Sequence, residues 1–100
     1  MDAQYKKGVL DLVVLSQLKD TDAYGYELTD RISREMSIKA GTLYLVLKRL
    51  KDNGYLSTYL KESSDGPARK YYHLTEAGDQ YRNGQKEEWQ SFVEKVGRLI

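Results

Sequence analysis

The chain contains no cysteine, a single proline and a single histidine among its 100 residues. Without cysteine it can form no disulfide framework, no thiolate zinc site and no cysteine nucleophile, and one histidine argues against a histidine-rich metal centre. No apolar run approaches the roughly 20 residues of a membrane span. Asp11 interrupts the apolar stretch that follows Lys7, so a signal-peptide core is missing. We therefore expect a single cytoplasmic domain with no metal ion or other cofactor.

The chain as a whole is nearly neutral, but its basic and acidic residues are unevenly distributed along the sequence. Sixteen basic and 15 acidic residues give a net charge of +1. Residues 37–72 hold seven basic and three acidic residues, a net of +4, and the remaining residues sum to −3. A basic segment within a near-neutral protein is typical of a local contact with a polyanion, although basic residues often cluster by chance at this scale.

Residues 39–54 have the pattern of a helix of about four turns that ends at a glycine. Its apolar positions follow i, i+3, i+4, i+7 spacing and define one face: Leu43, Val46, Leu47 and Leu50. The opposite face carries Gly41, Leu45, Lys48, Arg49 and Asp52. An anchored helix with small residues at its start and a basic outer face can enter a DNA major groove. The same pattern also suits an ordinary amphipathic helix with solvated lysines.

Two further helices are predicted before this one. Residues 8–19 are apolar on more than one side, which favours a buried helix. Residues 23–36 follow a break and N-cap at 20–22, and Tyr24, Leu28 and Ile32 mark their core side. Because residues 37–39 form only a short link to the next helix, the two helices match a helix-turn-helix pattern.

A hairpin is predicted after the helices. Residues 55–62 and 68–74 alternate as strands do, and the turn between them has a basic flank of Lys61, Arg69 and Lys70. A hairpin added to a helix-turn-helix is a wing, whose basic tip suits a phosphate backbone or a minor groove. The alternative is a solvated hairpin whose lysines protect an edge strand.

The final helix is predicted from Glu76 to about Leu99, with Thr75 as its N-cap. A polar stretch between Tyr81 and Trp89 separates its apolar stripe from the first core, so the stripe needs another partner. A second copy of the chain is the usual solution, and the wide apolar surface of residues 8–19 could share the interface. The alternative is that the helix folds back on its own core. The candidate interface residues are Val9, Leu10, Val13, Val14, Trp89, Phe92, Val93, Val96 and Leu99.

Several motifs, in this order and spacing, resemble the PadR-like winged-helix transcriptional regulators. They are Tyr24-Gly25-Tyr26-Glu27-Leu28, Gly41-Thr42-Leu43-Tyr44 with Leu47, Leu50 and Gly54 after it, Gly66-Pro67-Ala68-Arg69-Lys70-Tyr71-Tyr72, and Leu74-Thr75-Glu76-Ala77-Gly78. The resemblance covers nearly the whole chain and is closest to the subfamily with one C-terminal helix. It departs from the family at Leu45, where proline is common, and Leu45 on the outer face could touch a thymine methyl group.

The resemblance implies a homodimer in which the last helix packs on the first helix of the partner, and a repressor of nearby genes. Some relatives release DNA when a planar aromatic or hydrophobic compound binds at the dimer interface. Trp89 matches the tryptophan that stacks on the ligand in those relatives. Simple interface packing is the other interpretation of this side chain.

We expect a mostly α, α+β fold: a winged helix-turn-helix domain at 1–74 with a two-stranded wing, and a long dimerisation helix at 75–100 in the same structural unit. Its partner would be a near-palindromic double-stranded DNA with half-sites about one turn, ~34 Å, apart. Tyr44 is expected to donate its hydroxyl to a phosphate, as the resemblance suggests. The candidate DNA contacts are Lys39, Thr42, Tyr44, Leu45, Lys48, Arg49, Lys61, Arg69 and Lys70.

Two other classes of function compete with this one. A winged helix can also bind a protein, and the wing tyrosines (Tyr59, Tyr71 and Tyr72) would suit such a contact. An enzyme is disfavoured because the sequence offers no nucleophile–base pair, phosphate loop or metal cluster. His73 fits an exposed strand position better than a catalytic base.

Overall fold

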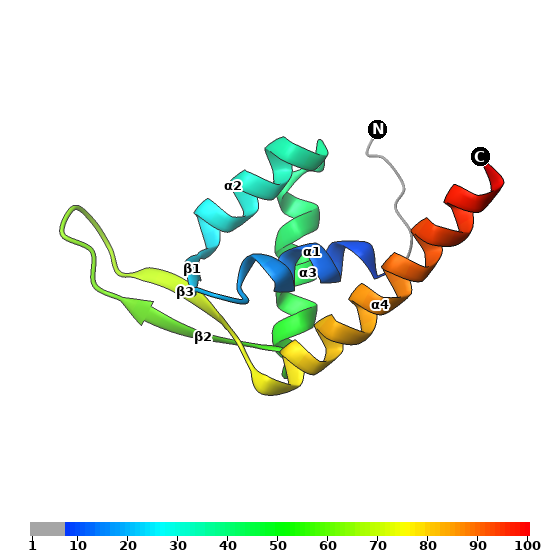
Figure 1. Ribbon diagram of the computed structural model, residues 1–100. Coiled ribbons are helices and arrows are strands. Elements are labelled where there is room, and N and C mark those ends of the chain that lie inside the picture. The colour runs from blue at the N-terminus through cyan, green and yellow to red at the C-terminus, as the bar shows by residue number, and fades with distance from the viewer. Residues whose placement is uncertain (1–7) are drawn as a thin grey trace.

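The computed structural model describes residues 8–100, so residues 1–7 of the predicted DNA-binding domain lie outside it. Its elements follow in the order α1 (Val9–Gln17), β1 (Ala23–Tyr24), α2 (Gly25–Met36), α3 (Ala40–Asp52), β2 (Leu56–Lys61), β3 (Arg69–Leu74) and α4 (Glu76–Leu99). Helices α1, α2 and α3 cross one another at the centre, and the β2–β3 hairpin and α4 project from opposite ends (Figure 1). The described chain measures 53 × 32 × 21 Å. The mostly helical α+β fold with a wing is confirmed.

The core lies where the three central helices meet. All four apolar positions predicted for α3, namely Leu43, Val46, Leu47 and Leu50, are buried there. They pack with Leu15 of α1 and with Leu28 and Ile32 of α2 in one cluster. The i, i+3, i+4, i+7 spacing therefore identified the buried face of α3, which leaves the opposite face outside.

The start of the second helix was predicted two residues too early. Ala23 and Tyr24 form β1, which pairs antiparallel with Tyr72 and Tyr71 of β3, so the sheet has three strands in the order β1-β3-β2. Helix α2 begins at Gly25, where a Cβ atom would lie 2.9 Å from Cε1 of Tyr72. The helix thus starts against the ring of Tyr72, and the two preceding residues lie extended beside β3.

The hairpin strands extend beyond the core. Strands β2 and β3 pair from Leu56 opposite Leu74 to Lys61 opposite Arg69. Leu56 is buried, but Leu60 on the same face is exposed because that end of β2 has passed the helices. The outer half of the hairpin is therefore a projecting wing.

The end of α3 and the start of α4 are locked together. Gly54 has a φ of +81°, and the amides of Gly54 and Tyr55 donate to the carbonyls of Lys51 and Leu50, which closes α3 with a Schellman motif. Thr75 caps α4 by accepting from the amide of Gly78 at 3.0 Å, as predicted. Its hydroxyl also donates to the carbonyl of Gly54 at 2.7 Å.

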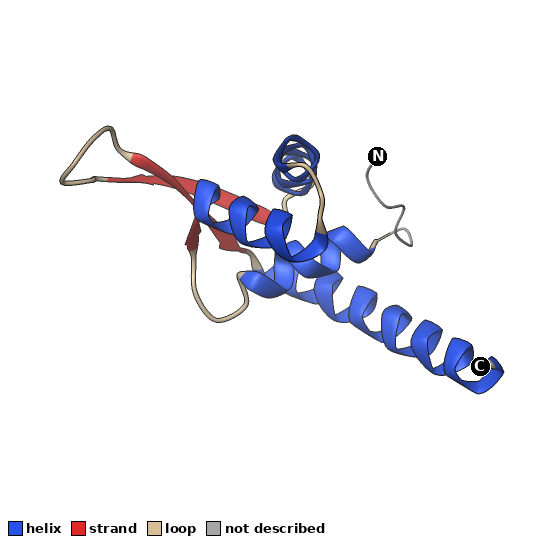
Figure 2. Ribbon diagram, turned by 90° about the horizontal axis from the view of Figure 1, so that it is seen from above, coloured by secondary structure: helices blue, strands red, loops and turns tan. Residues whose placement is uncertain are grey.

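Helix α4 leaves the body of the molecule along its length. Its first turns contact α1, and its C-terminal half extends away from the other helices, as Figure 2 shows from above. Arg82 in the polar stretch is buried and donates to Asp79 and Asn83.

Among residues 8–100, no helix is long and apolar enough to cross a membrane.

Gly78→Ala tests the close contact between α4 and the end of α3. A Cβ atom at this position would overlap the carbonyl oxygen of Tyr55 and lie 2.8 Å from Cδ1 of Leu74. We expect the substitution to lower the free energy of unfolding by about 3 kcal/mol, because backbone must move to accommodate it. Urea denaturation followed by circular dichroism measures the change.

Gly84→Ala in the same helix is the matched control. A Cβ atom there would meet nothing within 4 Å, so alanine should raise the free energy of unfolding by about 1 kcal/mol through its helix propensity. Equal effects of the two substitutions would contradict the proposed packing of Gly78.

Candidate nucleic-acid interface

The outer face of α3 is open along its N-terminal half. Lys39 is the N-cap residue of the helix, and a Cβ atom on Gly41 would meet nothing within 4 Å. Leu45 is 70% exposed, and Tyr44 is exposed beside it on the flank that faces the wing. Thr42 is half-buried on the other flank. A neighbouring surface can therefore approach the helix closely over its first two turns.

Lys48 continues this face and forms an ion pair with Asp52 one turn later, at 2.8 Å. This pair raises the pKa of Lys48 and lowers that of Asp52. Both side chains are exposed, and exposed pairs of this kind contribute little to stability. Lys48 is thus a charged ammonium that can exchange its partner for a phosphate.

Arg49 differs from the other α3 candidates because its guanidinium points to α1. Its Nη1 donates to Oδ2 of Asp11 at 3.1 Å, and its Nη2 donates to Oδ1 of the same carboxylate. Asp11 is only 5% exposed and also accepts from the hydroxyl of Tyr81 in α4 at 2.7 Å. The sequence prediction grouped Arg49 with the groove contacts and overlooked its partner Asp11 and the hydrogen bond from Tyr81 to the same carboxylate. The one sequence signal for this contact was Asp11 itself, an acidic residue on the otherwise apolar helix α1.

The wing carries three cations, each over a tyrosine ring. Lys61 Nζ lies 5.1 Å from the ring centre of Tyr71, Arg69 Cζ lies 5.0 Å from that of Tyr24, and Lys70 Nζ lies 5.8 Å from that of Tyr72. These contacts orient the side chains without neutralising them. Lys61 and Arg69 are direct cross-strand neighbours, a like-charge arrangement that favours a bound anion.

The two faces of the wing differ. Lys70 shares a face with Tyr72, which is buried against α2 and lies near Tyr44 of α3. Burial, and to a lesser extent the neighbouring Tyr44, raise the pKa of Tyr72. Lys61 and Arg69 extend from the opposite face. Lys70 is therefore the wing cation on the same side as the exposed face of α3.

A polar cluster fixes the base of the wing to the loop before β1. Asp22 accepts from the Tyr59 hydroxyl at 2.7 Å and from Nδ1 of His73 at 2.8 Å. Burial alone raises the pKa of Asp22, but these hydrogen bonds outweigh it, and the pKa falls below its ordinary value of 3.8. The sequence had suggested that residues 20–22 cap α2. Asp22 instead orients the hairpin.

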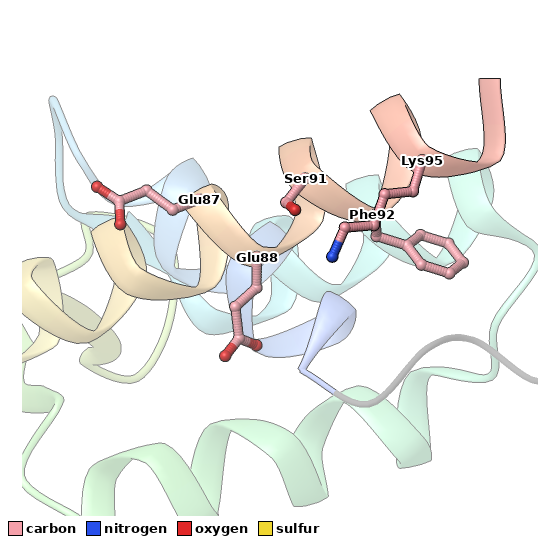
Figure 3. A pocket seen from close by; sticks show the side chains of 5 residues that line it. All are labelled: Glu87, Glu88, Ser91, Phe92 and Lys95. Atoms are coloured by element: carbon pink, nitrogen blue, oxygen red, sulfur yellow. The ribbon is translucent and has the colours of Figure 1, made fainter. Parts of the chain in front are cut away.

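The apolar stripe of α4 is uncovered in the single chain. Trp89, Phe92, Val93 and Val96 are 38–47% exposed, and Leu99 is more so. Figure 3 shows Phe92 projecting from α4 beside a surface hollow that Glu87, Glu88, Ser91 and Lys95 also line. The ring centres of Trp89 and Phe92 lie 5.9 Å apart. This surface needs a cover that the described chain does not supply.

The candidate interface residues of α1 divide into two groups. Val14 is 1% exposed in the core of its own chain, and Val9 is buried as well, so neither has surface left for a partner. Leu10 and Val13 are only partly buried. The prediction treated α1 as more open than it is, because α4 already covers part of it.

Residues 8–100 bring together no group of three or more histidine or acidic side chains that could hold a metal ion. What they do assemble is an open helix face and a basic wing on one scaffold. This architecture defines a winged helix-turn-helix protein.

The chain belongs to the PadR-like transcriptional regulator family, whose model matches residues 14–83. It is 36% identical over 94 residues to an uncharacterized protein of Lysinibacillus sphaericus, covering 90% of this chain and 86% of that one. A PadR-like transcriptional regulator from Bacillus cereus superposes with a TM-score of 0.81 at 33% identity, over 93% of this chain and 92% of that chain. A Streptococcus mutans crystal structure gives 0.86 at 34% identity, over 99% and 92% of the two chains. Proteins of this family regulate transcription by binding DNA.

Asp22→Asn tests the anchoring of the wing. Because the folded-state pKa of Asp22 lies below 3.8, its stabilising effect is fully present above about pH 4 and is lost as the pH falls through the folded-state value. At pH 7 the variant should lose about 1 kcal/mol of unfolding free energy, the usual contribution of such hydrogen bonds. Urea titrations between pH 2 and 7 should show this difference from the wild type shrinking in acid.

Asp65→Asn is the control, because Asp65 lies at the wing tip and accepts only from Ser63 and Ser64 among the described hydrogen bonds. It should change stability by less than about 0.5 kcal/mol. A loss in Asp22→Asn that is the same at every pH would show that the carboxylate charge is not what holds the wing.

Proposed function

We propose that this protein acts as a homodimer that binds a near-palindromic DNA operator and represses transcription. The observation that carries the proposal is the position of Lys70 on the same side as the exposed face of α3. A helix for the major groove and a cation for the adjacent phosphate thus face one way. Such a regulator acts where the DNA is, in the cytoplasm.

In this mechanism the first two turns of α3 enter the major groove. Leu45 at the centre of the exposed face can contact a thymine methyl group, and Thr42 lies beside it. Lys39 at the N-terminus and Lys48 at the rim are placed to contact phosphates, with Lys48 exchanging its bond to Asp52. The Tyr44 hydroxyl donates to a phosphate on the wing side. Arg49 is the least suited of the candidates, because Asp11 already holds it.

The wing completes the DNA contact. Lys70 meets the backbone next to α3, and Lys61 and Arg69 contact it from the other face of the hairpin when the tip lies in the minor groove. The cation–π contacts keep these side chains extended over the strand, so little side-chain entropy is lost on binding.

The dimer forms through the α4 stripe. Five side chains of this stripe bury their exposed surface against helix α1 of the partner: Trp89, Phe92, Val93, Val96 and Leu99. They face Leu10 and Val13 of that partner helix. Two-fold symmetry then presents two α3 helices to half-sites about 34 Å apart. A planar aromatic or hydrophobic effector that inserts beside Trp89 would shift the dimer toward a spacing that does not fit the operator.

A protein-binding module is the second candidate function. Tyr59 is exposed and stacks beside Tyr71 at 5.7 Å between ring centres, which gives the outer face of the sheet an aromatic surface. Binding of a partner protein that is insensitive to salt, without DNA affinity, would favour this function.

Lys70→Gln tests the DNA contact while keeping most of the aliphatic stem over Tyr72. It should weaken binding to all sequences alike and reduce the slope of log affinity against log salt by about 0.9, the value for one phosphate. Fluorescence anisotropy at four salt concentrations measures both quantities.

Lys95→Gln in the distal half of α4 removes an equal charge far from the wing and should leave the slope unchanged. An unaltered slope in Lys70→Gln would remove Lys70 from the contact surface. Salt-dependent binding that is lost equally in both variants would point to nonspecific attraction.

Val96→Glu tests the dimer, because it places a charge in the centre of the exposed stripe. We expect a monomer at concentrations where the wild type is a dimer, since a buried unpaired carboxylate is strongly unfavourable in an interface. Sedimentation equilibrium measures the mass of each species.

Ser91→Glu is the matched control, because Ser91 is exposed and lies about 140° around α4 from Val96, so the same charge can face solvent. It should remain a dimer. A dimer in Val96→Glu as well would place the interface elsewhere on the molecule.

A further inference from the structure

One buried carboxylate joins three helices. Asp11 of α1 accepts both Nη groups of Arg49 from α3 and the hydroxyl of Tyr81 from α4. Arg49 is one of the nine candidates for reading DNA, and Tyr81 precedes the exposed stripe by eight residues in the same helix. A single side chain therefore connects the helix proposed to enter DNA with the helix proposed to form the dimer.

A second contact reinforces this connection. The ring of Tyr81 stacks on that of Tyr55 with 4.3 Å between centres and 4° between planes. Tyr55 directly follows Gly54, which closes α3, and Gly54 in turn accepts a hydrogen bond from the N-cap of α4. Helix α4 is thus tied to the end of α3 at its N-cap residue, Thr75, and again at Tyr81, about 1.7 turns later.

The chemistry of the cluster makes it a rigid link. Burial, assisted by the hydrogen bond to Asp11, raises the pKa of Tyr81 to about 12, so its hydroxyl stays a donor. The forked guanidinium of Arg49 matches the carboxylate with two parallel hydrogen bonds and fixes its orientation. Loss of either donor would leave the buried carboxylate short of a partner, so the arrangement resists partial opening.

We propose that Asp11, Arg49 and Tyr81 are positioning residues that set the angle between α3 and α4, and through it the half-site spacing that the dimer accepts. This inference rests on the proposed function. Arg49 then contributes to DNA recognition from within the protein and contacts no base.

The geometry of the dimer makes this link influential. Helix α4 has 24 residues and is about 36 Å long, and its distal half carries the interface stripe. If two copies join through that half, a change in the angle between α3 and α4 is repeated in both protomers. A small change in the angle between α3 and α4 at Tyr81 therefore alters the separation of the two α3 helices in the dimer, while each α3 helix keeps its own base contacts.

Tyr81→Phe is the variant that tests the link most cleanly, since it removes one hydroxyl and retains the ring on Tyr55. Tyr59→Phe is its matched control, because it removes a tyrosine–aspartate hydrogen bond of the same 2.7 Å length that does not join α3 to α4. The DNA is obtained by selection from a random pool with the wild type, and its two halves are then moved apart or together by one or two base pairs.

For Tyr81→Phe we expect the affinity ratio between the preferred spacing and its neighbours to change by about fivefold, with the base preferences in each half-site unchanged. Tyr59→Phe acts through the anchoring of the wing on every spacing alike, so it should keep the wild-type ratio. Equal ratios for Tyr81→Phe and the wild type would overturn the proposal.

Arg49→Lys separates positioning from base reading. Lysine keeps the positive charge but loses the fork, so it should alter the spacing ratio as Tyr81→Phe does. A changed base preference at one position of the half-site, with the spacing ratio intact, would show that Arg49 reads DNA and that the proposal is wrong.

A measurement without DNA keeps the inference apart from the proposed function. The chain has no cysteine, so Lys51→Cys in α3 and Gln90→Cys in α4 give two unique spin-label sites. Diluted with unlabelled protein, this pair should show a broader or shifted distance distribution when Tyr81→Phe is added, and no change with Tyr59→Phe. An identical distribution in Tyr81→Phe would refute the link, whereas a wild type that selects no DNA sequence would refute the proposed function alone.

Discussion

The arrangement of helices depends on the buried carboxylate of Asp11. It lies on an otherwise apolar helix and is stable there because Arg49 and Tyr81 reach it from two other elements. A buried carboxylate with only one of these donors would be costly. The three helices are therefore held in one relative position, whereas apolar packing alone would tolerate small rotations.

This constraint fixes the relative position of two surfaces that would otherwise be independent. On one side, α3 presents Leu45 and Lys48 next to the wing, and on the other, the distal half of α4 presents an apolar stripe that begins at Trp89. The first surface has the features of a DNA contact and the second those of an interface between subunits. Reading a two-part operator requires a fixed relation between such surfaces, which a rigid junction of α3 and α4 can provide.

Much of the fold could be predicted because its signals are local. The apolar spacing of α3, the glycine at position 54 and the cap at Thr75 each fix an element through nearby residues. The pairing of β1 with β3 could not be predicted in this way, because two residues carry no periodicity and their partners lie almost 50 positions later. The same holds for the Asp11 cluster, whose members are 38 and 70 residues apart. An arginine on the flank of a helix looks the same in sequence whether it faces a phosphate or a buried acid.

The central claim, that this chain is a sequence-specific dimeric regulator, is tested most directly by titrating the wild-type protein against the DNA upstream of its own gene and against random DNA of equal length. The account predicts two chains per site, an affinity for the upstream DNA at least about a thousandfold higher, and a steep dependence on salt. Equal affinity for both DNAs, or one chain per site at saturation, would contradict it.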